Sequence, residues 1–249
     1  MTAISKQRVA VVTGAGSGIG RAMAQAFAQA DYRVVVADVD ADRATQTATD
    51  IGEQALAVQI DISDADAVDR AVETVLNTYG RIDVLGNNAG IMDRMALPAD
   101  TSLAQWQRVI DINLTGTFLL TKAVLPHMLE RGAGVIVNTA SEAGIRGGAA
   151  GIAYTASKHG VVGITRNVAW AHADDGIRCN AVLPGPTMTG MAPDVDLVGA
   201  ARLQPIIELN GKRRAQPEQM AAVAVFLASD AASFVNGAIV PVDAGWSAG

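Results

Sequence analysis

Short apolar runs alternate with longer amphipathic stretches along the whole chain. The runs are rich in Val, Ile, Leu and Ala and lie at residues 9–12, 33–37, 55–60, 82–86, 134–138, 177–183 and 238–242. The stretches between them carry apolar residues at helical spacing, as at 65–79, 103–128, 152–173 and 217–228. This alternation predicts βαβ crossovers and therefore an α/β fold, a doubly wound parallel sheet of about seven strands with helices on both faces.

The composition fits one domain spanning residues 1–249. No Pro- or Ser-rich linker divides the 249 residues, a length that α/β folds often use as one domain. Half of the residues are hydrophobic and only 4% are aromatic, so we expect a core of aliphatic side chains. The formal charge of -6 argues against a surface for nucleic acids or anionic membranes.

Cysteine and histidine predict neither a disulfide nor a metal site. Cys179 is the single cysteine, and His127, His159 and His172 lack the spacing of metal ligands. The first residues lack the long apolar core of a signal peptide, and we expect no apolar run that spans a bilayer. These features predict a cytoplasmic protein without a bound metal.

A glycine-rich turn follows the first apolar run. Gly14, Gly18 and Gly20 allow a tight turn whose backbone approaches a ligand closely, and a helical pattern starts at Ile19. Free N–H groups and the positive end of the helix dipole converge at such a helix N-terminus, which favours a bound pyrophosphate. A glycine turn without a ligand is the alternative, but strand, glycines and helix follow here in the order that dinucleotide binding requires.

Asp38 ends the second run, eighteen residues after Gly20. A carboxylate at this place accepts hydrogen bonds from both ribose hydroxyls of an adenosine and repels a 2′-phosphate. Val39, Asp40 and Ser17 supply no cation that would hold such a phosphate. The sequence therefore predicts NAD rather than NADP. An N-cap for the stretch from residue 41 is a second role, compatible with the first.

Tyr154 and Lys158 stand four residues apart in a helical pattern and so share one helix face. A cation close to a phenol favours the phenolate, which makes the proton easier to give and to take near neutral pH. The alternative is a chance pairing of a helix-face Tyr with a solvated Lys. The pair gains its weight from the glycine turn that accompanies it.

Polar residues follow three further runs, at the strand ends where ligands bind in a doubly wound sheet. Asp61 follows the third run, residues 87–90 the fourth, and Ser141 the fifth. Plain turn chemistry accounts for each of these residues equally well when it is taken alone. Asn113 lies inside a long helical pattern, where Asn is a poor helix former and a buried amide needs partners.

Taken together, these motifs resemble the short-chain dehydrogenase/reductase family. The matching motifs are Thr-Gly-x-x-x-Gly-x-Gly at 13–20, Asn-Asn-Ala-Gly at 87–90, Asn113, Ser141, Tyr-x-x-x-Lys at 154–158 and Pro184-Gly185. They stand in the family's order and spacing from about residue 8 to residue 245. Gly86 departs from the pattern, because the family usually has an aliphatic residue there, and we expect a looser end of the fourth strand.

The resemblance implies a Rossmann-type domain that binds NAD and a tetrad of catalytic residues. Tyr154 would be the general acid/base, and Ser141 would hydrogen-bond the substrate oxygen. Lys158 would bind the nicotinamide ribose and lower the Tyr154 pKa, while Asn113 would support a water-linked proton relay through Lys158. The cofactor would also contact Gly14, Ser17, Gly18, Ile19, Gly20, Asp38, Asp61, Ile62, Asn88, Ala89, Gly90, Pro184, Gly185, Thr187 and Thr189.

The function expected on these grounds is an NAD-dependent interconversion of a secondary alcohol and a ketone by hydride transfer. Reduction of a 3-oxoacyl thioester is the alternative among enzymes, although such reductases generally use NADPH and Asp38 weighs against it. A non-catalytic dinucleotide-sensing protein on the same fold is a third hypothesis, which the intact tetrad disfavours. The resemblance also implies a homotetramer, and Pro241 places the last strand at a sheet edge that would take part in it.

The substrate is expected to be a small, mostly apolar alcohol or ketone. Residues 187–214 follow Pro184-Gly185 and would form a mobile cover over it, as in this family. Several apolar side chains of this cover can equally be ordinary helix core, and Arg94, Glu142 and Arg146 could add polar contacts near Ser141. The apolar side chains are Met188, Met191, Leu197, Leu203, Ile206 and Ile207.

Overall fold

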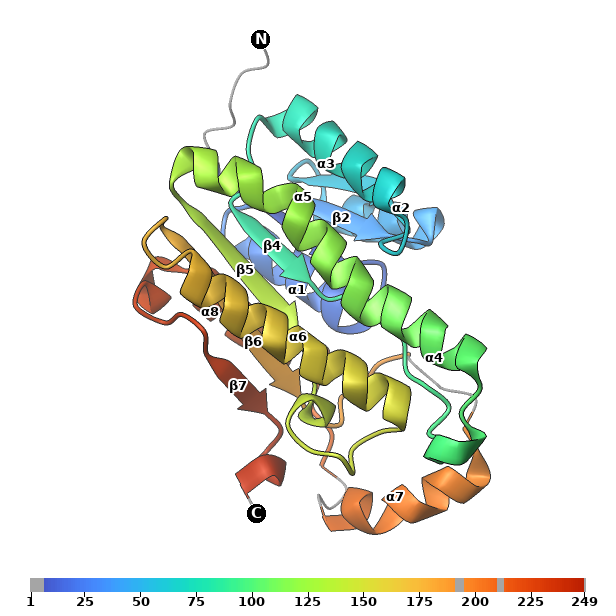
Figure 1. Ribbon diagram of the computed structural model, residues 1–249. Coiled ribbons are helices and arrows are strands. Elements are labelled where there is room, and N and C mark those ends of the chain that lie inside the picture. Colours follow the sequence, from blue (N-terminus) through green and yellow to red (C-terminus); the bar gives the residue numbers. More distant parts are fainter. Residues whose placement is uncertain (1–6, 191–194, 210–212, 249) are drawn as a thin grey trace.

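A computed structural model describes residues 7–190, 195–209 and 213–248 of the chain. Its strands form one parallel sheet in the order β3-β2-β1-β4-β5-β6-β7, shown in Figure 1. The strands are β1 (Val9–Thr13), β2 (Arg33–Asp38), β3 (Ala55–Gln59), β4 (Val84–Asn87), β5 (Gly134–Thr139), β6 (Ile177–Pro184) and β7 (Ile239–Val242). From β1 the chain adds β2 and β3 on one side, and from β4 it adds β5, β6 and β7 on the other side. The predicted doubly wound α/β fold is therefore confirmed.

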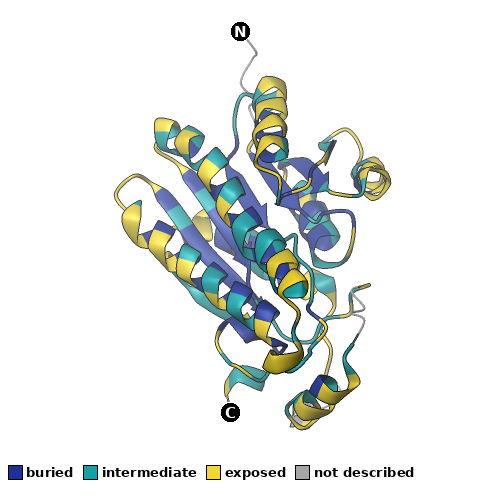
Figure 2. Cartoon of the chain, turned by 45° about the vertical axis from the view of Figure 1, so that its right-hand side comes forward, coloured by how far each residue is buried: buried dark blue, intermediate teal, exposed yellow. Residues whose placement is uncertain are grey.

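Helices cover both faces of the sheet. The helices on one face are α1 (Gly18–Gln29), α2 (Ala41–Ile51) and α8 (Pro217–Ala228). Those on the other face are α3 (Ala65–Tyr79), α5 (Gly116–Arg131) and α6 (Ile152–Ala171). Figure 2 shows the buried strands between helices whose outer faces are exposed. α7 (Leu197–Leu209) lies beyond the carboxyl ends of the strands.

The strand register brings the carboxyl ends of neighbouring strands together at one end of the sheet. Asn87 pairs with Asn138, and Thr139 pairs with Val182. Pro241 lies in β7, which ends the sheet, so the predicted edge strand is confirmed. A proline is tolerated there because its missing N–H costs no hydrogen bond on the outer side.

Two helices begin and end at the predicted residues because their ends carry strong local signals. Asp64 caps α3 by accepting the N–H groups of Asp66 and Ala67, and Gly80 ends it with a φ of 72°. α8 starts with Pro217, whose fixed φ suits the first helical position.

The pattern predicted as one helix over 103–128 consists of three consecutive segments. α4 (Leu103–Ile110) passes into a π-helical turn, η2 (Asp111–Thr115), and then into α5. By length and hydropathy alone, the run Leu103–Arg131 is able to cross a bilayer, contrary to the sequence expectation. Leu120, Val124 and Met128 of this run lie in the core, so a core helix accounts for its apolar character.

Gly86 does not loosen the end of β4. A Cβ at this position would lie 3.1 Å from Cε of Met23, which packs over the glycine from α1. Gly86 also keeps its pairing with Val12 and Val137 on the neighbouring strands. The Met23 side chain fills the space of the missing aliphatic residue, and the expectation of a looser strand end is wrong.

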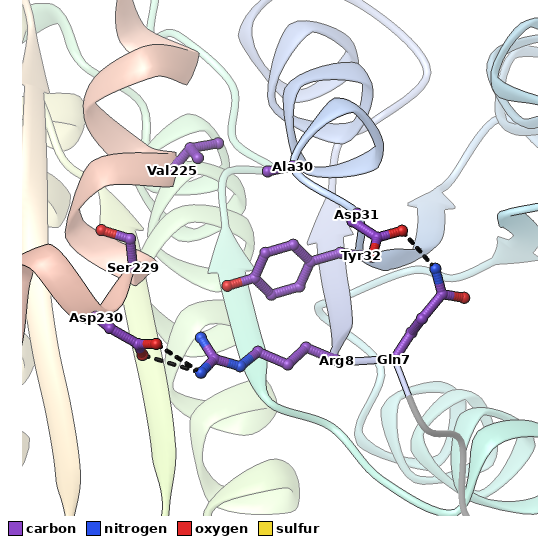
Figure 3. Close-up of a pocket in the computed structure, with 8 residues that line it drawn as sticks. All are labelled: Gln7, Arg8, Ala30, Asp31, Tyr32, Val225, Ser229 and Asp230. Atoms are coloured by element: carbon purple, nitrogen blue, oxygen red, sulfur yellow. Dashed lines mark hydrogen bonds and ion pairs between the residues drawn. The ribbon is translucent and has the colours of Figure 1, made fainter.

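A pocket of about 430 Å³ lies at the opposite end of the sheet, where β1 and β2 begin. Figure 3 shows that Arg8 extends over this pocket and reaches Asp230 of the 3-10 helix η4 (Asp230–Ala232). The Arg8 Nη2 group donates to both carboxylate oxygens at 2.9 Å. Both side chains are largely exposed, so the pair contributes little stability. The pocket is remote from the strand ends that carry the predicted site.

Candidate active site

Side-chain hydrogen bonds join the carboxyl ends of β1, β4 and β5. Thr13 Oγ1 accepts the N–H groups of Asn88 and Ala89, each at 3.1 Å. The Asn88 side chain donates to Thr13 O at 3.1 Å and accepts from Thr139 Oγ1 at 3.2 Å. Asn88 and Ala89 therefore hold three strand ends together and form the floor of the site.

The glycine turn after β1 has the shape of a phosphate cradle. Gly14 and Gly18 have φ angles of 63° and 51°, a conformation that favours glycine. A Cβ on Gly20 would overlap the carbonyl oxygen of Gly14. Ser17 is the exposed N-cap of α1 and makes no side-chain capping bond. The N-terminus of α1, with Ile19, is therefore available to the pyrophosphate of a dinucleotide.

Asp38 reaches this glycine turn from the end of β2. Its Oδ2 accepts the N–H of Gly16 at 2.8 Å, and its Oδ1 accepts the N–H of Asp40 at 3.0 Å. The N-cap of α2 is Asp40, which accepts the N–H groups of Asp42 and Arg43. The second role expected for Asp38, capping α2, is therefore wrong, because the helix begins too late for its side chain. The carboxylate remains directed at the turn.

Arg43 stands beside Asp38, and the sequence interpretation missed it. A Cβ on Gly16 would lie 2.7 Å from the Cβ of Arg43 and 2.9 Å from Oδ2 of Asp38. The Arg43 Nε pairs with Asp40 Oδ2 at 3.1 Å, and the Arg43 side chain is 65% exposed. The first turn of α2 brings residue 43 back to the strand end. Helical spacing from the cap, rather than adjacency to Asp38, is the signal that could have found this cation.

Tyr154, Ser141 and Lys158 come together at the end of β5. Ser141 is the N-cap of the 3-10 helix η3 (Glu142–Gly144), and its hydroxyl lies close enough to the Tyr154 phenol to act on the Tyr154 pKa in the lowering direction. Lys158 Nζ lies 5.5 Å from the centroid of the Tyr154 ring and donates to Thr139 O at 2.8 Å. Lys158 is 4% exposed. The predicted trio thus assembles from α6 and the loop after β5.

Burial shifts the pKa values of both α6 side chains toward their neutral forms. It raises the pKa of Tyr154 to about 12, where the Ser141 hydroxyl acts in the lowering direction and the Asp93 carboxylate adds to the rise. Burial lowers the pKa of Lys158 to about 8. The predicted lowering of the Tyr154 pKa by Lys158 is absent in the free protein, because removal from water is the larger effect.

Asn113 lies in the π-helical turn η2 and is fully buried. Its Oδ1 accepts the N–H of Ile91 at 2.8 Å, while Nδ2 donates to Ile91 O at 2.9 Å and to Ser157 Oγ at 3.2 Å. A Cβ on Gly90 would lie 3.1 Å from Asn113 Oδ1 and 3.6 Å from Lys158 Nζ. Asn113 therefore fixes the chain after β4 next to Lys158. Its part in a proton relay stays a prediction.

Two predicted adenine contacts differ in accessibility. Asp61 is exposed, and its Oδ1 accepts the N–H and the hydroxyl of Ser63 at 2.9 and 2.6 Å. Ile62 is buried in the core, where its side chain contacts Gly116 of α5. Asp61 thus combines turn chemistry with an accessible carboxylate, whereas Ile62 serves mainly as a core residue.

The segment after β6 starts beside the glycine turn. Pro184 ends β6, and Gly185 donates its N–H to the last residue of β7 at 3.1 Å. Thr187 Oγ1 donates to Gly185 O at 2.9 Å. A Cβ on Gly18 would lie 3.2 Å from Cγ2 of Thr189. Thr189 therefore borders the glycine turn, and its contact with the cofactor stays a prediction.

α7 is the helix within the described residues of the predicted cover. The Asp196 N–H donates to Arg94 O at 2.7 Å, and Ile206 contacts Gly148 in the loop after η3. The cover thereby spans the loops that follow β4 and β5. Among the other predicted apolar residues, Leu203 is half-buried, and Met188 and Leu197 are exposed. Met191 and the side chain of Ile207 lie outside the described residues.

Glu142, next to Ser141, is a buried carboxyl group beside a second one. Glu142 is 1% exposed, and burial together with Asp243 raises its pKa to about 7. Arg146 Nε lies 3.3 Å from Glu142 Oε2, and its guanidinium lies 5.5 Å from the centroid of the Trp246 ring. Glu142 and Arg146 are thus near Ser141, as expected. Their contacts are with Asp243 and Trp246, so they connect η3 to the C-terminal turn.

Asp93 is the second residue that the sequence interpretation missed. It is buried after β4, and its Oδ2 accepts the N–H of Tyr154 at 3.0 Å. The raised Tyr154 pKa also depends in part on its charge. Its sequence context is that of any loop aspartate, so only the folded arrangement identifies it.

Comparison with known proteins agrees with this geometry. The family model described as "Enoyl-(Acyl carrier protein) reductase" matches residues 14–247. The chain is 45% identical over 248 residues to cis-4-hydroxycyclohexanecarboxylate dehydrogenase from Sinomonas cyclohexanicum, with 97% of each chain covered. It is 42% identical over 250 residues to 3-oxoacyl-[acyl-carrier-protein] reductase from Synechocystis sp., with 98% of each chain covered.

A solved structure shares the whole fold. Levodione reductase matches with a TM-score of 0.90 and 37% identity, and the match covers 99% of both chains. The similarity thus extends over the sheet, the glycine turn, the Tyr154 helix and α7. The chain belongs to the short-chain dehydrogenase/reductase family.

Proposed function

We propose that the protein is an NAD-dependent oxidoreductase that interconverts a secondary alcohol and a ketone, with Tyr154 as general acid/base. The observation that carries the proposal is the cluster of Ser141, Tyr154 and Lys158 at the strand ends, beside a glycine turn that fits a dinucleotide. The two relatives described above are named for a cyclic secondary alcohol and for a 3-oxoacyl group. Both names describe alcohol–ketone chemistry.

The residues of the site divide the proton chemistry among them. Ser141 hydrogen-bonds the substrate oxygen, and Tyr154 takes the hydroxyl proton during oxidation and returns it during reduction. The Lys158 ammonium, 5.5 Å from the ring, stabilises the negative charge that forms on the phenol in that step. NAD supplies the hydride acceptor when it is bound. The burial of Lys158 strengthens its electrostatic effect on the phenol.

The carboxylate of Asp38 supports NAD as the preferred cofactor. From the end of β2 it reaches the glycine turn, where its Oδ2 accepts the N–H of Gly16 at 2.8 Å, and this position supports hydrogen bonds from ribose hydroxyls. Asp40 adds a second negative charge and pairs with Arg43 at 3.1 Å. A 2′-phosphate would meet two carboxylates, and Arg43, the cation beside Asp38, is already engaged with one of them.

A cyclic, mostly apolar secondary alcohol is the substrate class that we propose. The cover contributes aliphatic side chains from α7, including Leu203 and Ile206 over the loop at Gly148. Such a lining favours a hydrocarbon ring, with Ser141 and Tyr154 binding its single oxygen. The names of the Sinomonas relative and of levodione reductase point to cyclic substrates as well. Cyclohexanols are therefore the first compounds to assay.

Reduction of a 3-oxoacyl thioester is the second candidate. The Synechocystis relative carries this name, and the matching family model is described by a reaction on acyl carrier protein. Asp38 argues against it, since such reductases generally use NADPH. The net charge of -6 also disfavours docking of an acidic carrier protein. Faster turnover of an acetoacetyl thioester with NADPH than of cyclohexanol with NAD would favour this candidate.

We further propose a homotetramer. Large apolar side chains are exposed in two parts of the fold: Phe118 and Trp170 on α5 and α6, and Phe226 on α8 with Phe234 just before β7. Two independent surfaces, each pairing with itself about a two-fold axis, generate a tetramer with three perpendicular two-fold axes.

The proposed role of Tyr154 is tested by Tyr154→Phe. This change removes the proton-transferring oxygen alone, so we expect kcat for cyclohexanol oxidation to fall ~100-fold or more. NADH binding, followed by fluorescence, should remain near wild type. Tyr79→Phe removes a phenol oxygen at the far end of α3 and serves as the control. Retention of more than about a tenth of kcat in Tyr154→Phe would contradict the role. Nucleotide binding without turnover of any alcohol by the wild type would instead indicate a dinucleotide-sensing protein.

A further inference from the structure

Asp93 caps the helix that carries the catalytic tyrosine. It lies in the loop after β4, is 3% exposed, and accepts three backbone N–H groups. Its Oδ1 accepts those of Met95 and Gly151 at 3.0 and 3.1 Å, and its Oδ2 accepts that of Tyr154 at 3.0 Å. A carboxylate removed from water requires such bonds to offset its lost hydration.

On the catalytic helix, Asp93 accepts the N–H groups of the N-cap residue Gly151 and of Tyr154. Gly151 is the N-cap residue and has no side chain, so the cap comes from a residue 58 positions earlier in the chain. Tyr154 is the third residue of α6, and its N–H is one that an N-cap group ordinarily accepts. A Cβ at Gly151 would lie 2.5 Å from Asp93 Oδ2. Asp93 therefore anchors the backbone of Tyr154 to the loop after β4.

The same loop also holds the cover. The Asp196 N–H, just before α7, donates to Arg94 O at 2.7 Å. The first turn of α7 packs against the loop as well, because Gly199 contacts Met95 O. The segment around Asp93 is thus attached on one side to the substrate cover and on the other to the catalytic helix.

Three side chains from three parts of the fold act on the phenol of Tyr154. The Ser141 hydroxyl, from the loop after β5, acts on the Tyr154 pKa in the lowering direction. Lys158 lies one turn further along α6, with Nζ 5.5 Å from the ring. Asp93, from the loop after β4, acts through its negative charge, which raises the Tyr154 pKa. The helix dipole and the three N–H bonds hold that negative charge in place.

We propose that Asp93 is a positioning residue of the active site: it fixes the backbone of Tyr154 by capping α6 from the loop after β4. The inference rests on the function proposed above, because it concerns the proton that Tyr154 transfers. It assigns Asp93 no contact with substrate or cofactor.

The test compares Asp93→Asn with Asp64→Asn. Asp64 caps α3 in the same way, through two backbone N–H groups, and lies on the surface. The neutral amide in Asp93→Asn removes a negative charge near the phenol, so the Tyr154 pKa falls. The rise of kcat/KM with pH in alcohol oxidation should therefore move to lower pH by about half a unit or more. The amide offers a single acceptor oxygen, so kcat should also fall about tenfold, with the KM for NAD unchanged.

A second measurement needs no turnover. Amide hydrogen exchange of residues 151–154 should accelerate in Asp93→Asn and stay unchanged in Asp64→Asn. If Asp93→Asn fails to fold, Asp93→Ser keeps one acceptor oxygen with a smaller side chain, and the same shifts are expected. Unchanged exchange at 151–154, or a pH profile that does not move while stability falls, would overturn the inference. Absence of turnover in the wild type would refute the proposed function, and hydrogen exchange would still decide whether Asp93 anchors Tyr154.

Discussion

At the scale of single residues, burial competes with charge pairing in the site. The sequence predicts that Lys158 makes Tyr154 more acidic, yet the free protein has a Tyr154 pKa of about 12 and a Lys158 pKa of about 8. Both shifts have desolvation as their largest cause, since each group loses water when it enters the cleft. Tyr154 is therefore a neutral phenol at physiological pH. Lys158 begins to lose its positive charge just above physiological pH, so alkaline pH would remove the charge that stabilises the phenolate in the proposed mechanism.

The pairing of Arg43 with Asp40 leads to a prediction about cofactor choice. We expect the wild type to favour NAD at least ~100-fold in kcat/KM, about 3 kcal/mol, for lost ribose bonds and phosphate repulsion. Asp40→Ser keeps an N-cap oxygen for α2, removes one negative charge and releases Arg43, which can then pair with a 2′-phosphate. Steady-state kinetics should show that preference reduced about tenfold.

The control for this prediction is the double variant Asp40→Ser with Arg43→Ala. Without the guanidinium, most of the gained NADP activity should disappear. If NADP activity rises equally with and without Arg43, the loss of the Asp40 negative charge alone accounts for the change in cofactor preference. Equal use of NAD and NADP by the wild type would show that Asp38 does not govern the choice.

The sequence predicts residues whose roles are local and misses those that act through the fold. The glycines, Asp38, Ser141, Tyr154 and Lys158 follow from motifs, since spacing along one strand or helix fixes their relation. Asp93 is different, because two of its acceptor bonds reach α6 across 58 and 61 positions of the chain. No local pattern encodes such a contact, which depends on the pairing of β4 with β5.

At the scale of elements, prediction succeeded where a helix end has its own signal. Both ends of α3 carry such a signal, Asp64 as N-cap and Gly80 after its last turn, and α8 begins with Pro217. The π turn at Asp111–Thr115 keeps helical periodicity on both sides and so remains invisible in the sequence. α7 contains Pro205 within its length, which obscures its helical pattern.

Buried polar groups inside the sheet were equally hidden. Asn138 Oδ1 accepts from Asn87 at 2.9 Å, and Asn138 Nδ2 donates to Thr165 Oγ1 at 2.9 Å. This network joins β4, β5 and α6 directly beneath the site. The apolar pattern identifies the strands, but it gives no indication which of their polar residues meet in the interior.

Glu142 of η3 and Asp243 of the C-terminal turn are neighbouring carboxyl groups, and their shifted pKa values lead us to predict a pH dependence of stability. The Glu142 pKa rises from 4.5 to about 7 on folding, so the folded state keeps a proton that the unfolded state releases. Its stabilising contribution is full below pH 4.5 and is lost as pH rises to about 7. The lowered Asp243 pKa acts in the opposite sense, but only below its ordinary value of 3.8. The two effects therefore occupy separate pH ranges.

Glu142→Gln tests this dependence. The Gln amide stays neutral at every pH, so the variant should lose less unfolding free energy than the wild type between pH 4.5 and about 7. Denaturant unfolding at a series of pH values measures the difference. Glu73→Gln, on the exposed side of α3, should follow the wild type. Parallel curves for Glu142→Gln and the wild type would show that the proton on Glu142 contributes nothing to stability.

At the scale of the whole molecule, the catalytic end of the sheet and the exposed apolar surfaces lie on different sides. The site lies at the carboxyl ends of the strands, on the side of the sheet where α7 lies (Figure 1). Trp170 lies on the outward side of α6, the helix that carries Tyr154, and Phe234 lies just before the edge strand β7. Association through these surfaces would leave the cleft open and would add rigid neighbours to the catalytic helix.

The predicted tetramer can be tested one surface at a time, through Trp170 on α6 and through Phe234 just before β7. Trp170 is 84% exposed, and Lys in its place would put a charge into one self-pairing interface while leaving the other intact. We expect light scattering to report tetramers for the wild type, dimers for Trp170→Lys and for Phe234→Lys, and monomers for the double variant. Val39→Lys adds the same charge at an exposed position after β2 and should remain tetrameric. A monomeric wild type at micromolar concentration would refute the tetramer, and a tetrameric Trp170→Lys would exclude the α6 surface from it.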